Sequence, residues 1–316
     1  MAALVLTASI GIAVAPDDGN HAAKLMRHAD MAMYHAKNSG RDQVVFFSAA
    51  MNQAIWLQIE LEHALRGAVE RGEFRVEYQP VVRLSDGQVV GAEALLRWRH
   101  PGLGEVSPAE FITVAEQTGQ IEALGAIVLS DTLARLKRWR ERVPEFRVSI
   151  NISPAQFRHP GFATRLSEAL AGHGLDGSAL VIEVTEGLLL SDHPGLRTIF
   201  SDLARSGVRL LMDDFGTGYS SLGYLRDFPF GGIKIDRSFI SGLDRDQRKR
   251  KLVRSAIRLG RALELVVIAE GVEREEELAA LAEEGCDLVQ GYLLFRPMPP
   301  EAVDELLATG PRVRLP

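Results

Sequence analysis

The stretch RLLMDDFGTGYSSLGYL, residues 209–225, joins an apolar run to two adjacent carboxylates and then to two glycines. Asp213 and Asp214 are neighbours, so their charges repel each other. A buried acid is also costly unless a cation compensates it. Other parts of the chain must therefore supply the positive charge that makes this stretch tolerable.

The composition limits the classes of protein to which the chain can belong. It has 316 residues, of which 46% are hydrophobic and 25% charged, as in an ordinary soluble globular protein. A formal net charge of -6 argues against a nucleic-acid polymer as partner, because such binding needs a basic face. A locally basic pocket for one anionic ligand is still compatible with this charge. The single cysteine, Cys286, excludes a disulfide framework and a thiolate cluster, and a cytoplasmic location is expected.

The opening sixteen residues, MAALVLTASIGIAVAP, look at first like a signal peptide that ends in Ala13–Val14–Ala15. The segment lacks a positively charged start, however, and Gly11 interrupts a run that alternates like a strand. We interpret it as a strand. No other stretch is apolar for long enough to span a membrane, so no membrane contact is expected from the chain itself.

Residues 1–50 predict only a few elements. In order these are a strand, a turn, a helix ending near Gly40 and a second strand: Leu4–Val14, Pro16–Gly19, Ala22–Lys37 and Gln43–Phe47. So few elements cannot bury a core, which indicates a piece of a domain. A charged amphipathic helix from Met51 to about Arg71 follows, and we assign residues 51–72 to a connecting helix.

From residue 73 onward, strand-like runs alternate with helical segments. The predicted strands are Arg75–Leu84, Val89–Trp98, Arg147–Asn151, Ala179–Thr185, Arg209–Asp213, Gly232–Ile235, Leu263–Ala269 and Leu288–Leu294. This rhythm predicts an α/β fold, a TIM-like (β/α)8 barrel over residues 73–316. Only SDGQ, residues 85–88, joins the first two strands, and a parallel crossover needs a dozen or more residues. The first strand is therefore expected to run antiparallel.

Polar residues gather where these strands end, which is where barrel enzymes place their chemistry. They are Glu93, Arg97, Asn151, Glu183, Glu186, Asp213, Asp214, Lys234, Glu270, Glu273 and Gln290. Several have structural explanations when taken singly. Asp214 and Asn151 are of the type that caps helices, Lys234 of the type that reaches solvent, and Glu273 begins an acidic run that suits a helix start. Their convergence on one rim favours a site.

The most telling residues are Glu93, Glu183 and Asp213, because they interrupt otherwise apolar strands. Oxygen ligands joined by one amide suit hard cations such as Mg²⁺ or Mn²⁺. Paired aspartates let one carboxylate bridge two ions, and two-metal sites serve in-line displacement at phosphoesters. Two bound metals would thus neutralise Asp213 and Asp214, while Arg97 and Lys234 would supply the positive charge that a phosphodiester needs.

Most of the chain resembles a known protein family. Residues 73–316 resemble EAL-domain cyclic di-GMP phosphodiesterases, with the name-giving triplet Glu93–Ala94–Leu95 inside GAEALLRW. The blocks EYQPVV, SPAEFI, NISPAQF, EVTE, DDFGTGYSSL, IKID, AEGVE and QGY follow or precede it in the family's order. The resemblance implies hydrolysis of one phosphodiester of cyclic di-GMP to give linear pGpG, with two Mg²⁺ or Mn²⁺ ions per site.

The resemblance also implies roles for individual residues. Ligands of a first metal would be Glu93, Asn151, Glu183 and Asp213. Asp213 would bridge to a second metal, held also by Asp214 and Glu270, and Lys234 would lie near the attacking water. Gln79, Arg97 and Gln290 would contact the substrate, while Glu186 and Glu273 would be supporting acids. Glu270, Lys234 or the metals alone stay open as the agent that deprotonates the water.

Residues 1–50 resemble the C-terminal part of a GGDEF domain, in TASIGIAVAPDDG and LMRHADMAMYHAKNSGRDQV. The GGDEF signature is absent from the chain, so no cyclase activity is expected of this remnant. The resemblance therefore predicts a piece of a longer GGDEF–EAL protein, which leaves room for an upstream sensor or membrane anchor. It also suggests a homodimer formed through barrel helices.

Two other functions compete with the phosphodiesterase. A catalytically silent cyclic di-GMP receptor would bind the nucleotide and signal by a change of shape, but such members typically lose metal ligands, and none is lost here. An unrelated barrel enzyme acting on a sugar phosphate would be expected to carry a glycine-rich phosphate loop near the last two strands. AEGVE and QGY offer an acid and an amide there instead.

Overall fold

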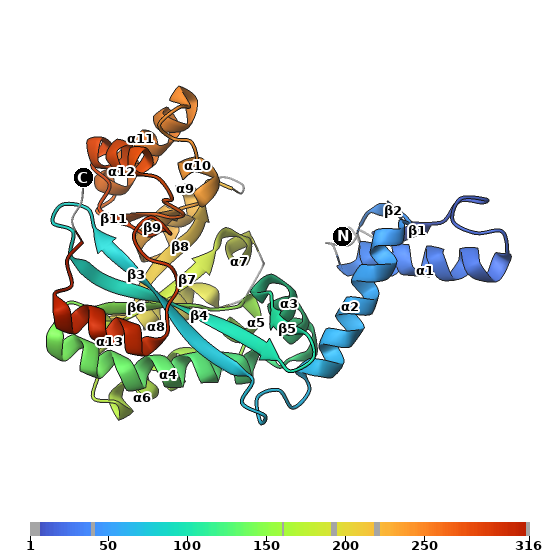
Figure 1. The fold of residues 1–316 in the computed structure, drawn as a ribbon, viewed down its shortest axis with the longest axis horizontal. Helices are drawn as coiled ribbons and strands as arrows, with labels where there is room; N and C mark the ends of the chain where they lie inside the picture. The colour runs from blue at the N-terminus through green and yellow to red at the C-terminus, as the bar shows by residue number, and fades with distance from the viewer. Residues whose placement is uncertain (1–6, 39–41, 160, 191–194, 218–221, 314–316) are drawn as a thin grey trace, which may run out of the picture. The chain divides into compact units, whose positions relative to one another are not determined.

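The computed structural model describes residues 7–38, 42–159, 161–190, 195–217 and 222–313 (Figure 1). The chain divides into two compact units, one comprising residues up to Ala68 together with Ala109–Val114, and the other comprising Val69–Pro108 and Ala115 onward. None of the described helices is both long enough and apolar enough to cross a membrane.

The smaller unit contains β1 (Ile10–Ile12), α1 (Ala22–Asn38), β2 (Val44–Phe46) and α2 (Ala49–Leu65). The two strands pair in parallel, with Ile10 opposite Val44. Val44 and Phe46 nevertheless stay 55% and 60% exposed, as expected of elements too few to bury a core.

Two sequence predictions for this unit need correction. The helix expected over Met51–Arg71 ends at Leu65, and the chain then turns through Gly67, whose φ of 74° is left-handed. Only Ile10–Ile12 of the strand predicted over Leu4–Val14 is extended and paired, and residues 4–6 and Gly40 lie outside the described residues.

The larger unit is a barrel, as predicted. Its strands are β3 (Phe74–Arg83), β4 (Val89–His100), β5 (Gly104–Val106), β6 (Arg147–Asn151), β7 (Leu180–Thr185), β8 (Arg209–Phe215), β9 (Phe230–Ile235), β10 (Val266–Ala269) and β11 (Leu288–Val289). The sheet runs in the order β3-β11-β10-β9-β8-β7-β6-β4-β5, and an added pairing of β3 with β4 closes it. The antiparallel first strand is confirmed, because β3 is antiparallel to both β4 and β11. The sequence had not predicted β5, a short edge strand that pairs with the end of β4.

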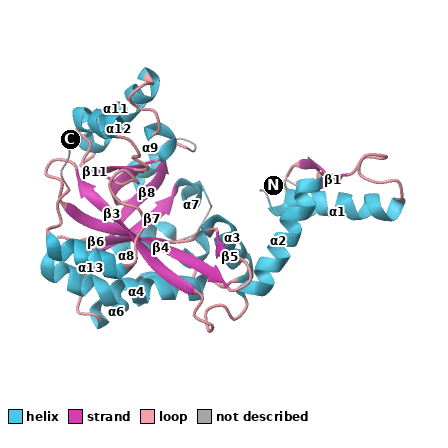
Figure 2. Ribbon diagram, in the orientation of Figure 1, coloured by secondary structure: helices cyan, strands magenta, loops and turns pink. Residues whose placement is uncertain are grey.

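Helices cover the outside of this barrel (Figure 2). The helices of the larger unit are α4 (Ile121–Arg142), α5 (Pro154–Phe157), α6 (Phe162–Gly172), α7 (Glu186–Leu190), α8 (Leu196–Arg205), α9 (Leu222–Asp227), α10 (Arg237–Ile240), α11 (Gln247–Ala262), α12 (Glu275–Glu284) and α13 (Pro300–Thr309), with a 3-10 turn at Gly177–Ala179. A further helix, α3 (Pro108–Thr118), is shared between the two units. α4 and α13 lie side by side, joined where the Trp139 indole N–H donates to Asp304 at 2.7 Å. The main core lies between the strands and these helices.

The last predicted strand, Leu288–Leu294, is wrong beyond Val289. The chain leaves the sheet because its backbone pairs instead with Val272, which donates to the Gln290 carbonyl at 3.1 Å and accepts from Leu293 at 3.0 Å. A Cβ added at Gly291 would lie 2.1 Å from the Val272 carbonyl oxygen, so this approach requires glycine. Similarly, β10 begins at Val266 and not at the expected Leu263, which caps α11.

Alternate residues of each strand point into the barrel and form layers along its axis. A middle layer is apolar and contains Val81, Val181, Leu211 and Ile268. Two residues further toward the C-terminal ends of the parallel strands, the inward positions are polar. The fold therefore places the side chains predicted for the site at one mouth of the barrel, above an apolar plug.

Candidate active site

The centre of this mouth is the ammonium of Lys234, which is 1% exposed. Its Nζ lies 2.6 Å from Glu183 Oε2, 3.3 Å from Glu93 Oε2 and 3.7 Å from Asp213 Oδ1. It also forms an ion pair with Glu270. One cation thus faces four carboxylates that arrive from four different strands or strand ends, β4, β7, β8 and the residue after β10.

Lys234 reaches this position because the inward-facing residue before it on β9 is Gly232, which has no side chain. A Cβ added at Gly232, the next residue on the inward face, would lie 2.5 Å from both the Leu211 side chain and the Val266 carbonyl. Glycine therefore lets the neighbouring strands pack closely below the lysine stem. The sequence predicted Lys234 at this rim but not its central place among the acids.

A set of amide side chains holds Glu93 from the other side. Asn151 Nδ2 donates to Glu93 Oε1 at 2.8 Å, and Gln290 Nε2 donates to Glu93 Oε2 at 2.9 Å. Gln290 also donates to Gln79 Oε1 at 3.0 Å, and Gln79 in turn donates to the Phe295 carbonyl at 3.0 Å. The helix cap after Asn151 is provided by Ser153, so the capping alternative for Asn151 does not apply. These amides orient the Glu93 carboxylate.

Gln290 leaves one polar atom unused. Its Oε1 is buried and has no hydrogen-bond partner among the described residues. A buried acceptor of this kind usually has a partner, and leaving it unmet is costly. Gln290 therefore presents an acceptor that suits a donor from a bound molecule.

Asp214 differs from its neighbour Asp213. It has a φ of 56°, a left-handed conformation that is uncommon for residues other than glycine, and its carbonyl accepts from the backbone and hydroxyl of Thr217. Burial and the adjacent Asp213 charge raise the pKa of Asp214. Glu186 accepts a hydrogen bond from the Gly216 backbone N–H at 3.2 Å, so this supporting acid contacts the turn that follows the pair.

The acids around Lys234 show that its charge does not balance theirs. Burial, followed by repulsion from Glu93, raises the pKa of Glu183 well above its usual range. Burial and the Glu93 and Asp213 charges raise the pKa of Glu270 to about 7, against the pull of Lys234. The pKa of Glu93 is lowered, because Lys234, Gln290 and Asn151 outweigh the effect of its burial. Burial opposes the ammonium of Lys234, but the surrounding carboxylates raise its pKa well above the usual value.

Above the acids lies a cavity of about 220 Å³, and its wall contains residues that the sequence analysis did not single out. Arg237 lines it and forms an ion pair with Glu273 at 2.9 Å. Tyr292, 46% exposed, also lines it and stacks under the Arg296 guanidinium at 4.5 Å. Arg237 follows Lys234 by three residues, and Tyr292 ends the QGY block. Their closeness in sequence to predicted site residues was the signal that could have identified both of them. Glu273 thus pairs with a cation at the rim, and α12 begins after it at Glu275.

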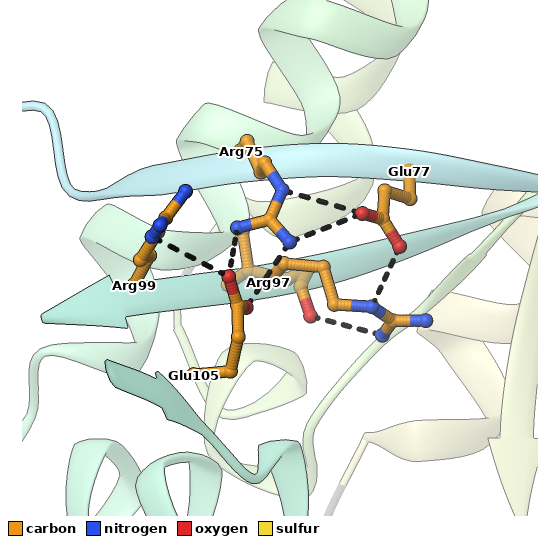
Figure 3. Close-up of polar contacts among 6 residues, drawn as sticks. Arg75, Glu77, Arg97, Arg99 and Glu105 are labelled. Carbon is orange, nitrogen blue, oxygen red and sulfur yellow. Dashed lines mark hydrogen bonds and ion pairs between the residues drawn. The ribbon is translucent and has the colours of Figure 1, made fainter. Parts of the chain in front are cut away.

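Arg97 does not line this cavity. It lies on the same face of β4 as Glu93, two alternations further along the strand, with Leu95 between them. Figure 3 shows its guanidinium beside Glu77, to which its Nε donates at 3.0 Å. Glu77 also pairs with Arg75, and Arg75 with Glu105, in a network across β3, β4 and β5. The structure therefore brings Gln79 and Gln290 to the acids and holds Arg97 at the periphery.

The chemistry of the site fits divalent cations. Four carboxylates face one ammonium, so negative charge remains to be neutralised. The atoms available to bind a metal are oxygens, which hard divalent cations prefer. Within the described ranges, no three Asp, Glu, His or Cys side chains are already gathered as a metal-binding group. The Lys234 ammonium occupies the central position among the four carboxylates.

Most of the chain is similar to known families and proteins. Residues 62–297 match the family model described as the EAL domain, and residues 1–43 match the model described as the diguanylate cyclase GGDEF domain. The bifunctional diguanylate cyclase/cyclic di-GMP phosphodiesterase MucR of Pseudomonas aeruginosa is 42% identical over 96% of the chain and 44% of its own length. The cyclic di-GMP phosphodiesterase PdeR of Escherichia coli is 36% identical over 94% of the chain and 45% of its own length.

The chain thus spans less than half the length of these curated relatives. Among solved structures, the PaMucR phosphodiesterase in complex with c-di-GMP matches with a TM-score of 0.73 and 40% identity. That match covers 77% of the chain and 99% of the solved chain. The barrel fold therefore has a counterpart in a protein solved with c-di-GMP.

Proposed function

Because the chain belongs to the EAL domain family, we propose that it hydrolyses cyclic di-GMP to linear pGpG with the help of divalent cations. The observation that carries the proposal is the excess of carboxylates around Lys234 at the mouth of the barrel. The relatives named as cyclic di-GMP phosphodiesterases support the choice of substrate.

The residues that would hold Mg²⁺ or Mn²⁺ are Glu93, Asn151, Glu183, Asp213, Asp214 and Glu270. Two bound cations would supply electrostatic stabilisation of the phosphodiester and lower the pKa of an attacking water. In the reaction, the water oxygen forms a bond to phosphorus, the bond from phosphorus to the ribose oxygen breaks, and the leaving oxygen gains a proton.

The chain's own residues have separate tasks in this proposal. Lys234 keeps the four carboxylates together, and its protonated ammonium has no lone pair with which to accept a proton. Glu270 has a side chain that is 21% exposed, which is more than Glu93, Glu183 or Asp213. Glu270 is therefore better placed than Lys234 to accept the proton of the water. Gln79 and Gln290 would contact the substrate, with the unused Gln290 oxygen as an acceptor.

We also propose roles for residues outside the group of carboxylates around Lys234. Arg97 would hold a phosphate of the substrate from the periphery, and Glu186 and Glu273 would support the loop and the rim. Residues 73–316 would form the catalytic domain, with residues 51–72 connecting it to the GGDEF remnant at residues 1–50. A homodimer formed through barrel helices belongs to the same proposal.

The test is a turnover assay on the whole chain. The purified protein is incubated with cyclic di-GMP and Mg²⁺ or Mn²⁺, with an EDTA control, and the nucleotides are separated by chromatography. Metal-dependent appearance of pGpG is the expected result. Intact substrate, together with tight binding measured in parallel, would instead identify a catalytically silent cyclic di-GMP receptor and overturn the proposal.

A further inference from the structure

The opposite mouth of the barrel, at the N-terminal ends of its parallel strands, contains a larger cavity of about 670 Å³. Its wall combines apolar side chains from α11, β10 and β11 with four arginines, Arg83, Arg147, Arg209 and Arg261. Pockets for small molecules commonly have volumes of about 300–1,000 Å³. The cavity is therefore large enough for a ligand of nucleotide size.

Two of these arginines belong to the inside of the barrel. Arg147 begins β6 and Arg209 begins β8, and both also line a smaller cavity with Val181 and Leu211 of the middle layer. The alternation of β8 thus places Arg209, Leu211 and Asp213 on one face, from the basic mouth to the acidic one. The apolar layer between them separates this cavity from the candidate active site.

These inner arginines lack carboxylate partners. Arg147 Nε donates to the Ser178 carbonyl at 3.2 Å, and neither Arg147 nor Arg209 forms an ion pair with any residue that the structure describes. Arg83 does have acidic partners, Glu145 at 2.8 Å and Asp86 at 3.2 Å, but neither acid lines the cavity. Guanidinium groups that line a concave site and have no carboxylate as an ion-pair partner are suited to an anion.

The local packing keeps Arg209 in place. A Cβ added at Gly231 would lie 2.5 Å from Arg209 Cγ, so the arginine stem lies over a glycine on the neighbouring strand. Burial and the charges of Arg209 and Arg140 lower the pKa of Arg147. Burial disfavours the charged form of a guanidinium, and nearby cations disfavour it further. Packing therefore fixes Arg209, while Arg147 carries its charge close to other arginines.

The cavity also contains two acids, Glu264 and Asp287. Asp287 is already engaged, because its Oδ2 accepts a hydrogen bond from the Val267 backbone N–H at 2.9 Å. Four guanidinium groups against two carboxylates leave the wall positive.

We propose that the N-terminal mouth of this barrel is a second binding site, in which Arg147 and Arg209 hold the phosphate group of a small phosphorylated molecule. The site does not depend on the proposed hydrolysis, since it lies at the other end of the barrel. The shared chemistry is an oxyanion bound by two guanidinium groups. Its source is either free phosphate or a nucleotide whose base would lie against the apolar wall.

The experiment is isothermal titration calorimetry on the full chain, in EDTA and at constant ionic strength, with inorganic phosphate, pyrophosphate and a nucleoside monophosphate as probes. We expect saturable binding of at least one probe by the unmodified chain. Arg209→Gln should weaken it about tenfold or more, the loss expected for one hydrogen-bonded charged group. The matched control is Arg226→Gln, which replaces an exposed arginine that pairs with Asp227 and does not line the cavity; this variant should bind as the unmodified chain does.

Tighter binding of the nucleoside monophosphate than of phosphate would assign the apolar wall to the base, and equal binding would assign the site to the oxyanion alone. The absence of saturable heat with all three probes would overturn the proposal and leave the arginines a purely structural role. Unchanged affinity in Arg209→Gln would overturn it too.

A second measurement avoids variants that do not fold. Phenylglyoxal modifies accessible arginines, and peptide mapping by mass spectrometry reports each one. Pyrophosphate should protect Arg147 and Arg209 several-fold while leaving Arg226 unprotected. Equal modification with and without pyrophosphate would contradict the site.

Discussion

The two mouths of the barrel carry opposite charge although the same strands supply both. β6 presents Arg147 at one end and Asn151 at the other, and β8 presents Arg209 and Asp213. At the acidic mouth, a buried lysine holds the carboxylates together, and two amide side chains orient Glu93. At the basic mouth, Arg147 and Arg209 have no comparable partner among the described residues.

This difference shows how a barrel separates chemistry from scaffold. The acidic mouth lies at the C-terminal ends of the parallel strands, where loops are free to carry function. Its charges compensate one another within the protein only in part, so we expect it to depend on cations. We expect the basic mouth to depend on anions or on solvent. The following predictions test each dependence, starting with the largest expected effect.

Replacing Glu93 should have the largest effect. Glu93→Gln removes a charge that faces Lys234, Asn151 and Gln290, and we expect hydrolysis of cyclic di-GMP to fall by about a thousandfold or more, since metal-assisted stabilisation contributes several kcal/mol. The circular dichroism spectrum should be unchanged. Glu105→Gln, an exposed acid on β5, is the control and should keep its activity. Near-normal turnover in Glu93→Gln would remove Glu93 from the metal site.

Replacing Lys234 should mainly affect stability. Lys234→Met leaves four carboxylates without their buried cation, and breaking such a buried pair costs about 3–5 kcal/mol. Urea unfolding in EDTA measures this loss, and Mg²⁺ or Mn²⁺ should restore more stability to the variant than to the unmodified chain. Lys251→Met, at an exposed position on α11, should change the free energy of unfolding by less than about 0.5 kcal/mol. Equal effects of the two variants would show that Lys234 does not hold the acids.

The pH dependence of the metal-free protein should reflect Glu270. Its pKa is raised from 4.5 to about 7, so the folded state binds more protons than the unfolded state between these values. Stability is then greatest below the unfolded pKa and falls as pH rises through 7, by roughly 3 kcal/mol. Urea unfolding in EDTA from pH 4.5 to 7.5 measures the decline. Glu270→Gln should flatten it, and an equally steep decline in that variant would assign it to other groups.

Replacing Arg97 should have a smaller and more selective effect. Arg97 pairs with Glu77 and lies beyond Leu95 as seen from the acids, so its replacement should weaken substrate binding more than the chemical step. Arg97→Ala should therefore raise KM about tenfold and change kcat little. Steady-state kinetics separates the two constants. Arg99→Ala, which belongs to the same network, is the matched control. An unchanged KM in Arg97→Ala would refute contact with the substrate phosphate.

The smallest effect is expected at the basic mouth. Arg209→Gln relieves repulsion on Arg147 and should leave the free energy of unfolding unchanged, or raise it, within about 1 kcal/mol. The gain should shrink as salt is added, because salt screens the repulsion. Unfolding at low and high ionic strength checks this. A loss of several kcal/mol would show that Arg209 stabilises the barrel and would remove the contrast between its two mouths.

The sequence by itself determined the barrel and the residues at its rim. Alternating strands and helices predicted the fold, and the short SDGQ turn predicted the antiparallel first strand, because a four-residue connection cannot cross between parallel strands. Glu93, Glu183 and Asp213 were found because acids in apolar strands are costly without partners.

Only the tertiary structure decided how those residues meet. The end of β11 at Val289 depends on backbone pairing with Val272, a contact with a distant segment that local periodicity does not contain. The central place of Lys234, the peripheral place of Arg97 and the gathering of arginines at the other mouth likewise depend on the register of neighbouring strands. Register is set by packing across the whole barrel, so no single stretch of sequence encodes it.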